Sequence, residues 1–72
     1  MLKRMERNIL TPRELEVMDL LIYGYNNSII AEKLCISTHT IKAHISSIYE
    51  KLNVSNRVQA TVKYMQLYKT PN

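Results

Sequence analysis

The sequence predicts an all-α fold of four short helices. Glycine occurs once and proline twice among the 72 residues, which argues against a turn-rich all-β fold. Apolar residues recur at helical spacing along most of the chain. Residues of the types that cap helix N-termini precede these apolar patterns at four places. We therefore expect four helices joined by short connections.

The length and charge of the chain limit what it can be. A chain of 72 residues forms one domain, and it buries only about 60 % of its unfolded surface. Ten Lys and Arg against six Asp and Glu give a net charge of +4, which fits a polyanionic partner without proving one. Cys35 is the single cysteine, and a lone thiol in a chain without a signal peptide indicates a cytoplasmic protein. The apolar runs are too short to span a bilayer, so we expect no membrane partner.

The first predicted helix carries a complete start signal. Thr11 is in the N-cap position, Pro12 in the first helical position, and Glu14 completes a capping box. The helix should run to Tyr23, because Gly24 is a natural left-handed stop. Its inward face should consist of Val17, Leu20 and Leu21, with Met18 at the margin.

The second and third predicted helices are joined by a tight turn. Asn26 or Asn27 caps a helix of about two turns that ends near Cys35. Ser37 then caps a helix from about Thr38 to Leu52. Two helices in this arrangement form a candidate helix-turn-helix. The second helix should face inward through Ile30, Ala31 and Leu34, and the third through Ile41, Ile45, Ile48 and Leu52, which lie within about 60° of one another on a helical wheel.

The fourth predicted helix is capped by Ser55 and runs from Asn56 to about Tyr68. It carries two apolar stripes, about 115° apart at 3.6 residues per turn. The second stripe consists either of ordinary surface apolar residues or of a twofold contact with another copy of the chain, which we favour. The first stripe, which should close the core, is Ala60, Thr61, Tyr64 and Tyr68, and the second is Val58, Val62 and Met65.

The predicted domain therefore covers residues 10–69. Residues 1–9 are mostly polar and basic, so they are expected to be a flexible lead or a linker remnant. Residues 70–72 form a short tail.

The outer face of the third helix is small and polar in its N-terminal half. Small side chains allow a helix to lie deep in the major groove of DNA, which is about 12 Å wide. Lys42 can reach a guanine edge or a phosphate, and the Ala43 methyl can touch a thymine methyl. Glu50 would be repelled by phosphates, so only residues 38–47 should enter the groove. A polar outer face is also what any solvated surface helix has.

The motifs along the chain resemble the LuxR-type helix-turn-helix, the effector domain of NarL/FixJ-type response regulators, and are similar to the stand-alone regulator GerE. The resemblance covers roughly residues 10–67 without a gap. The matching elements are Leu10-Thr11-x-Arg13-Glu14-x-Glu16-Val17, Gly24, Ile30-Ala31, Leu34, Ile36-Ser37, Thr40-Ile41-Lys42-x-His44-Ile45, Ile48, Lys51-Leu52 and Asn56-Arg57-x-Gln59-Ala60.

This resemblance implies a tetrahelical, sequence-specific transcription regulator that pairs through its fourth helix on double-stranded DNA. Two departures from the family pattern matter. Many members carry a basic or amide residue at Ser46, and Ile29 replaces a usual polar residue. The base-reading positions would be Lys42, Ala43 and Ser46, and the backbone-contacting positions Thr38, Thr40, His44, Ser47, Lys51 and Arg57.

A protein-interaction module is the alternative, in which the helix-turn-helix docks RNA polymerase or a receiver domain. Such a site should present large apolar anchors, and the outer face of the third helix has none. An enzyme is not expected, because no catalytic set of residues is arguable. No cofactor or metal is expected either, since His39 and His44 lie about 140° apart around the helix. Cys35 should be a small, mostly buried thiol.

Overall fold

The computed structural model describes residues 9–69 as an all-α domain, which confirms the predicted fold class. Its α-helices are α2 (Pro12–Tyr23), α3 (Asn27–Leu34), α4 (Thr38–Leu52) and α5 (Arg57–Tyr64). A short π-helical segment, η1 (Met65–Lys69), continues directly from α5. No strand occurs within the described range. None of the helices there is long and apolar enough to cross a membrane.

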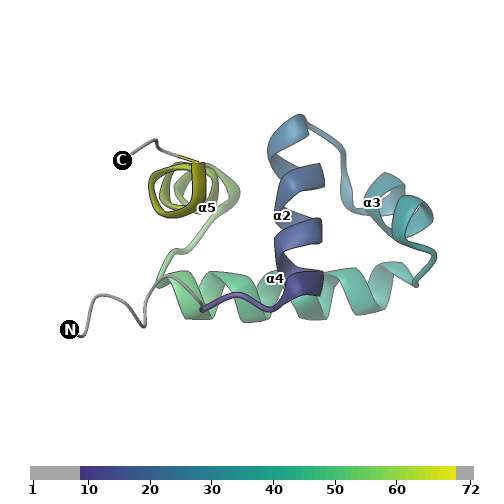
Figure 1. Cartoon of the computed structure of the whole chain (residues 1–72). Helices are drawn as coiled ribbons and strands as arrows, with labels where there is room; N and C mark the ends of the chain where they lie inside the picture. Colours follow the sequence, from purple (N-terminus) through teal and green to yellow (C-terminus); the bar gives the residue numbers. More distant parts are fainter. Residues whose placement is uncertain (1–8, 70–72) are drawn as a thin grey trace.

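The helix α4 is the base of the domain (Figure 1). In that view α2 stands across α4, with α3 on one side of α2 and α5 on the other. All three of these helices contact α4, and α2 also contacts both α3 and α5. The helix α2 is therefore the central element that joins the helix-turn-helix of α3 and α4 to the C-terminal helix.

The helix starts follow the capping signals, with one correction. The capping box at Thr11 is present, and Asn26 and Ser37 cap α3 and α4. The cap of α5 is Asn56, whose Oδ1 accepts from the backbone N–H of Gln59, so the prediction of Ser55 was wrong by one position. Both residues are good caps, and the Gln59 side chain in turn accepts from the Ser55 N–H.

The core contains most of the predicted inward residues, and the face that α2 buries is wider than its sequence pattern indicates. Met18 is fully buried although it was predicted at the margin, whereas Leu20 is only half-buried. Leu34 and Ile45 are also half-buried. The broader burial arises because α2 is surrounded by three other helices. The buried apolar residues are Leu10, Val17, Met18, Leu21, Ile30, Ala31, Ile41, Ile48, Leu52, Ala60 and Tyr64.

Three further details differ from the predictions. Cys35 is exposed rather than buried, because it ends α3 in the left-handed conformation (φ 59°) and so leaves the inner face of that helix. The α-helical part of the fourth helix ends at Tyr64, and η1 follows it. Ile9 was assigned to the flexible lead, and it packs half-buried against the core. The rest of the lead and the tail lie outside the described residues.

Replacement of the single glycine tests the turn between α2 and α3. We expect Gly24→Ala to lower the free energy of unfolding by about 1 kcal/mol. A methyl group there would have no atom within 4 Å, so the cost comes from the positive φ of 112° alone. Thermal unfolding followed by circular dichroism measures the change. Ser28→Ala, within the first turn of α3, is the control and should have little effect. Equal stability of Gly24→Ala and wild type would contradict the conformational argument.

Candidate nucleic-acid interface

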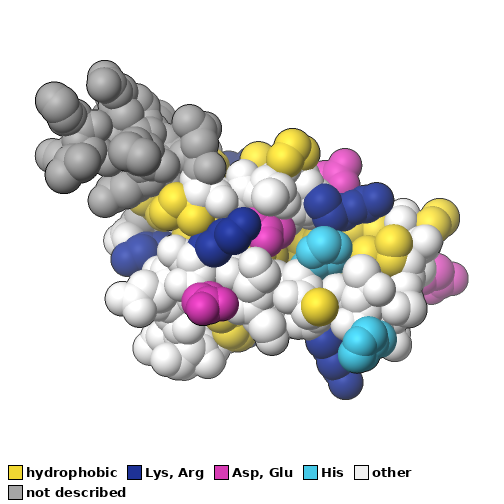
Figure 2. Space-filling view, turned by 90° about the horizontal axis from the view of Figure 1, so that it is seen from below, with side chains coloured by type: hydrophobic (Ala, Val, Ile, Leu, Met, Phe, Trp, Pro, Cys, Tyr) yellow, Lys and Arg dark blue, Asp and Glu magenta, His cyan; other side chains and the backbone are white. Residues whose placement is uncertain are grey.

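The outer face of α4 presents the three predicted base-reading residues together. Lys42, Ala43 and Ser46 are all exposed, and they follow one another along one side of the helix. The opposite side is core, with Ile41 and Ile48 fully buried. Figure 2 views the domain from the side on which α4 lies in Figure 1, and much of this face is polar, with Lys, Arg and His side chains distributed over it.

The first turn of α4 holds two of the predicted backbone-contacting residues. Thr38 is exposed and Thr40 is half-buried. The Ser37 hydroxyl accepts from the backbone N–H of Thr40, and the two hydroxyls share a hydrogen bond of 3.0 Å. His44, one turn further along, is half-buried at the edge of the same surface. Thr38 lies one turn before Lys42, whereas Thr40 and His44 lie about 160° from Lys42 around the helix, on the flank next to Ala43.

Glu14 links the start of α2 to the C-terminal half of α4. It is 4 % exposed and is the one buried charged residue among residues 9–69. Its Oε1 accepts from the Lys51 ammonium at 2.9 Å and from the Thr11 N–H at 2.9 Å. Its Oε2 accepts from the Ser47 hydroxyl at 2.9 Å. Two predicted backbone-contacting residues, Ser47 and Lys51, are thus held by one buried carboxylate.

The surroundings of Glu14 keep its carboxylate ionised at neutral pH. Burial by itself raises the pKa of Glu14, because it disfavours the charged form. The hydrogen bonds from Lys51, Thr11 and Ser47 and the charge of Lys51 act in the opposite direction and prevail, so the pKa lies below its ordinary value. Sequence reasoning assigned Glu14 only to the capping box. The available signal was that a carboxylate on an inward helix face needs a cationic partner.

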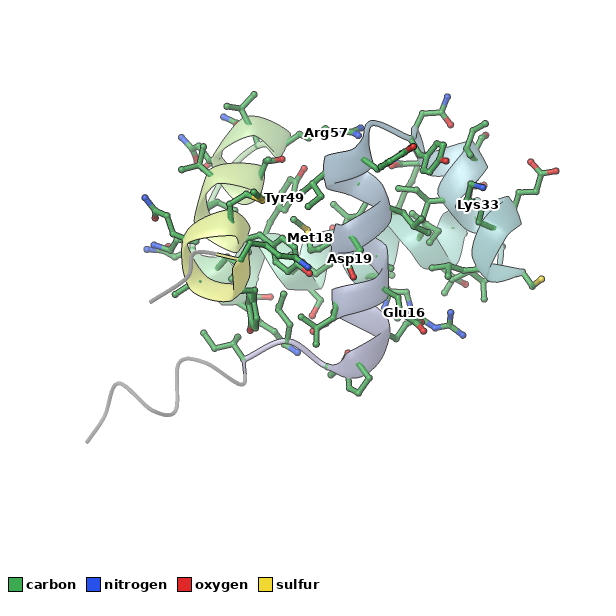
Figure 3. The ribbon with its side chains drawn as sticks, turned by 45° about the horizontal axis from the view of Figure 1, so that its top comes forward. Glu16, Met18, Asp19, Lys33, Tyr49 and Arg57 are labelled. Carbon is green, nitrogen blue, oxygen red and sulfur yellow. The ribbon has the colours of Figure 1, made fainter. Side chains whose placement is uncertain are left out.

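Arg57 lies away from the outer face of α4. Its Nη2 donates to the carbonyl oxygens of Leu21 at 2.7 Å and Tyr25 at 2.8 Å. Figure 3 shows the side chain reaching from the beginning of α5 to the end of α2. The structure therefore places Thr38, Thr40 and His44 on the N-terminal half of α4, where the predicted base-reading residues also lie. Ser47, Lys51 and Arg57 have partners within the domain.

The second apolar stripe of the C-terminal helix lies on the surface. Val58 is 72 % exposed, Val62 51 % and Met65 43 %. Shallow grooves flank the stripe, and Val58 and Val62 line both of them. One groove lies against α2 and includes Leu21. Within residues 9–69, the stripe forms an exposed apolar ridge.

No group of three His, Cys, Asp or Glu side chains in the described part of the chain could hold a metal ion.

The fold and the polar outer face of α4 define a helix-turn-helix domain of the kind that binds DNA. Residues 8–64 match the GerE family model, described as bacterial regulatory proteins of the luxR family. The chain belongs to this family, which confirms the resemblance seen in its motifs.

The relatives of the chain are transcription regulators. It is 50 % identical over 56 residues to the transcriptional regulatory protein DegU of Brevibacillus brevis, a match that covers 78 % of the chain and 24 % of DegU. It is 46 % identical over 59 residues to the nitrate/nitrite response regulator protein NarP of Escherichia coli, covering 82 % of the chain and 27 % of NarP. It is 43 % identical over 60 residues to the regulator MalT of Serratia proteamaculans, covering 83 % of the chain and 7 % of MalT. The chain thus spans about a quarter or less of these relatives.

Acid titration tests the role of Glu14. Because its pKa is lower in the folded state, its stabilising contribution is complete above pH 4.5 and is lost as the pH falls through the folded-state pKa. Glu14→Gln should lower the free energy of unfolding at pH 7 by about 1–3 kcal/mol, and the difference from wild type should shrink in acid. Urea unfolding at a series of pH values measures both effects.

Glu16→Gln is the matched control for this experiment. Glu16 lies on the same helix in an exposed ion pair with Arg13, so its loss should change stability by less than about 0.5 kcal/mol. A difference between Glu14→Gln and wild type that stays constant with pH would contradict the assignment.

Proposed function

We propose that this chain is the DNA-binding domain of a bacterial transcription regulator that acts in the cytoplasm. It would bind double-stranded DNA sequence-specifically, with the N-terminal half of α4 in the major groove. The observation that carries the proposal is the exposure of Lys42, Ala43 and Ser46 side by side on the helix that follows the turn. The regulatory names of the relatives support it.

The three base-reading candidates offer complementary chemistry. The Lys42 ammonium can donate to guanine O6 and N7, and the Ser46 hydroxyl can donate to or accept from a base edge. Ala43 can contact a thymine methyl and is small enough to let the helix approach. Glu50 is exposed one turn beyond Ser46, where a carboxylate would repel phosphates. The contact should therefore end before Glu50.

The backbone contacts would surround this surface. Thr38, Thr40 and His44 lie around the N-terminal half of α4 and are the best placed. Ser47 and Lys51 could still share their donors with a phosphate, since the Lys51 side chain is 34 % exposed. Arg57 has the least support among the predicted backbone-contacting residues, because its guanidinium already donates hydrogen bonds to two carbonyl oxygens.

Lys42→Ala tests the reading surface. We expect a loss of about 1–3 kcal/mol in binding to the preferred sequence, with a much smaller loss on unrelated duplexes, because a guanine contact is sequence-specific. Fluorescence anisotropy with both duplexes at several salt concentrations measures this. Lys63→Ala, which removes the same charge from α5, is the control. Equal losses on all duplexes would make Lys42 a phosphate contact, and binding that is independent of salt would favour the protein-docking alternative.

We also propose that the domain pairs through the ridge formed by Val58, Val62 and Met65. A twofold axis would bring this ridge against its own copy, which hides apolar surface that each protomer exposes. The two copies of α4 would then read half-sites about one helical turn apart. The ridge is narrow, so pairing in the absence of DNA should be weak.

Val62→Glu tests the pairing. It should abolish self-association in sedimentation equilibrium at high protein concentration, because two carboxylates would meet at the axis. It should also weaken binding to a two-half-site duplex more than to one half-site. Ile29→Glu is the control for sedimentation, since Ile29 is 37 % exposed on α3, away from the ridge. Identical sedimentation and DNA binding for Val62→Glu and wild type would exclude this interface.

A further inference from the structure

The helix α5, which carries the apolar ridge, is fastened to α2 at both ends. At its start, the Arg57 Nη2 donates to the carbonyl oxygens of Leu21 and Tyr25 at 2.7 and 2.8 Å. At its end, the Tyr64 hydroxyl donates to Asp19 at 2.6 Å. Figure 3 shows Arg57 and Asp19 at these two levels between the helices. The two polar contacts supplement the apolar packing of a small core.

The Arg57 contact also supplies a charge that α2 lacks. The last turn of α2 contains no basic residue, although its C-terminal carbonyl groups favour a nearby cation. The two carbonyl groups that Arg57 binds lie on either side of Gly24, where the chain leaves α2. One guanidinium nitrogen therefore joins the end of α2, the turn toward α3 and the start of α5.

This contact holds the start of the helix that carries the ridge. Val58 directly follows Arg57, and Val62 lies one turn later on the same helix. In a twofold pair, the angle between α5 and α4 in each protomer determines how far apart the two copies of α4 lie. A change in the position of the start of α5 would therefore change the distance between the two copies of α4.

We propose that Arg57 is a positioning residue that sets the spacing of the two DNA half-sites. This inference rests on the proposed pairing through Val58, Val62 and Met65. It assigns Arg57 a role in specificity that needs no contact with DNA. The specificity concerns the distance between half-sites rather than the sequence of either one.

The test compares the spacing preference of variants. A half-site is first obtained by selecting tight binders from a randomised duplex library with the wild-type protein. Synthetic duplexes then carry either one copy or two copies whose separation changes in steps of one base pair. Wild type should bind its best spacing on the order of tenfold more tightly than neighbouring spacings, because simultaneous engagement depends on geometry.

Arg57→Met should reduce this discrimination to about twofold while leaving affinity for the single half-site and its salt dependence unchanged. Arg57→Lys should give an intermediate profile, because an ammonium keeps the charge but loses the planar, multi-donor guanidinium. Lys63→Met removes a charge from the same helix without touching α2 carbonyl groups, and it should retain the wild-type profile. Circular dichroism establishes that each variant is folded.

Each other result has a distinct meaning. An unchanged spacing profile for Arg57→Met overturns the inference and leaves the proposed function intact. A weaker single-site affinity with a salt slope reduced by about one makes Arg57 a phosphate contact and also overturns it. A wild type without any spacing preference rejects the pairing and the inference together. If Arg57→Met does not fold, a wild-type profile for Arg57→Lys overturns the inference.

Discussion

The buried carboxylate of Glu14 is the interaction on which the placement of α4 depends. It accepts hydrogen bonds from Thr11 at the start of α2 and from Ser47 and Lys51 on α4. Ser47 and Lys51 lie four residues apart, so the carboxylate holds α4 at two points one turn apart. Apolar contacts through Ile41 and Ile48 fix which face of α4 is buried, while this polar link restricts sliding along α2. A charge in the core is tolerated because each carboxylate oxygen has donors.

The helix α2 is connected by polar contacts to both helices on which a binding surface is proposed, α4 and α5. Glu14 connects it to α4, and the carbonyl groups near its end connect it to Arg57 at the start of α5. Tyr64 adds a second connection to α5 through Asp19. A chain of this size has a thin apolar core, so a few long-range polar contacts can have a large effect on how its helices are oriented.

The distribution of polar partners along α4 agrees with the proposal that only the N-terminal half of this helix contacts DNA. Lys42 and Ser46 are exposed there, whereas the hydroxyl of Ser47 and the ammonium of Lys51 are bound to Glu14. The exposed carboxylate of Glu50 follows directly. The two halves of α4 therefore differ in the donors that they offer to a polyanion.

Local signals in the sequence were enough to predict the helices and the family of this protein. The capping box at Thr11, the left-handed stop at Gly24 and the regular apolar spacing in α4 each depend on neighbours within a few residues. Where two good caps stood together, at Ser55 and Asn56, local information could not choose between them. The exposed faces of α4 and α5 also followed from periodicity, since a helix that buries one side must expose the other.

Which polar groups meet depends on how the helices pack in three dimensions, and the sequence pattern did not predict it. The partners of Glu14 on α4 are 33 and 37 residues away in sequence, and the partners of Arg57 are 36 and 32 residues away. Met18 is buried because three helices surround α2, and Cys35 is exposed because the chain turns there. These outcomes depend on how helices pack against one another, which periodicity within a single helix does not specify.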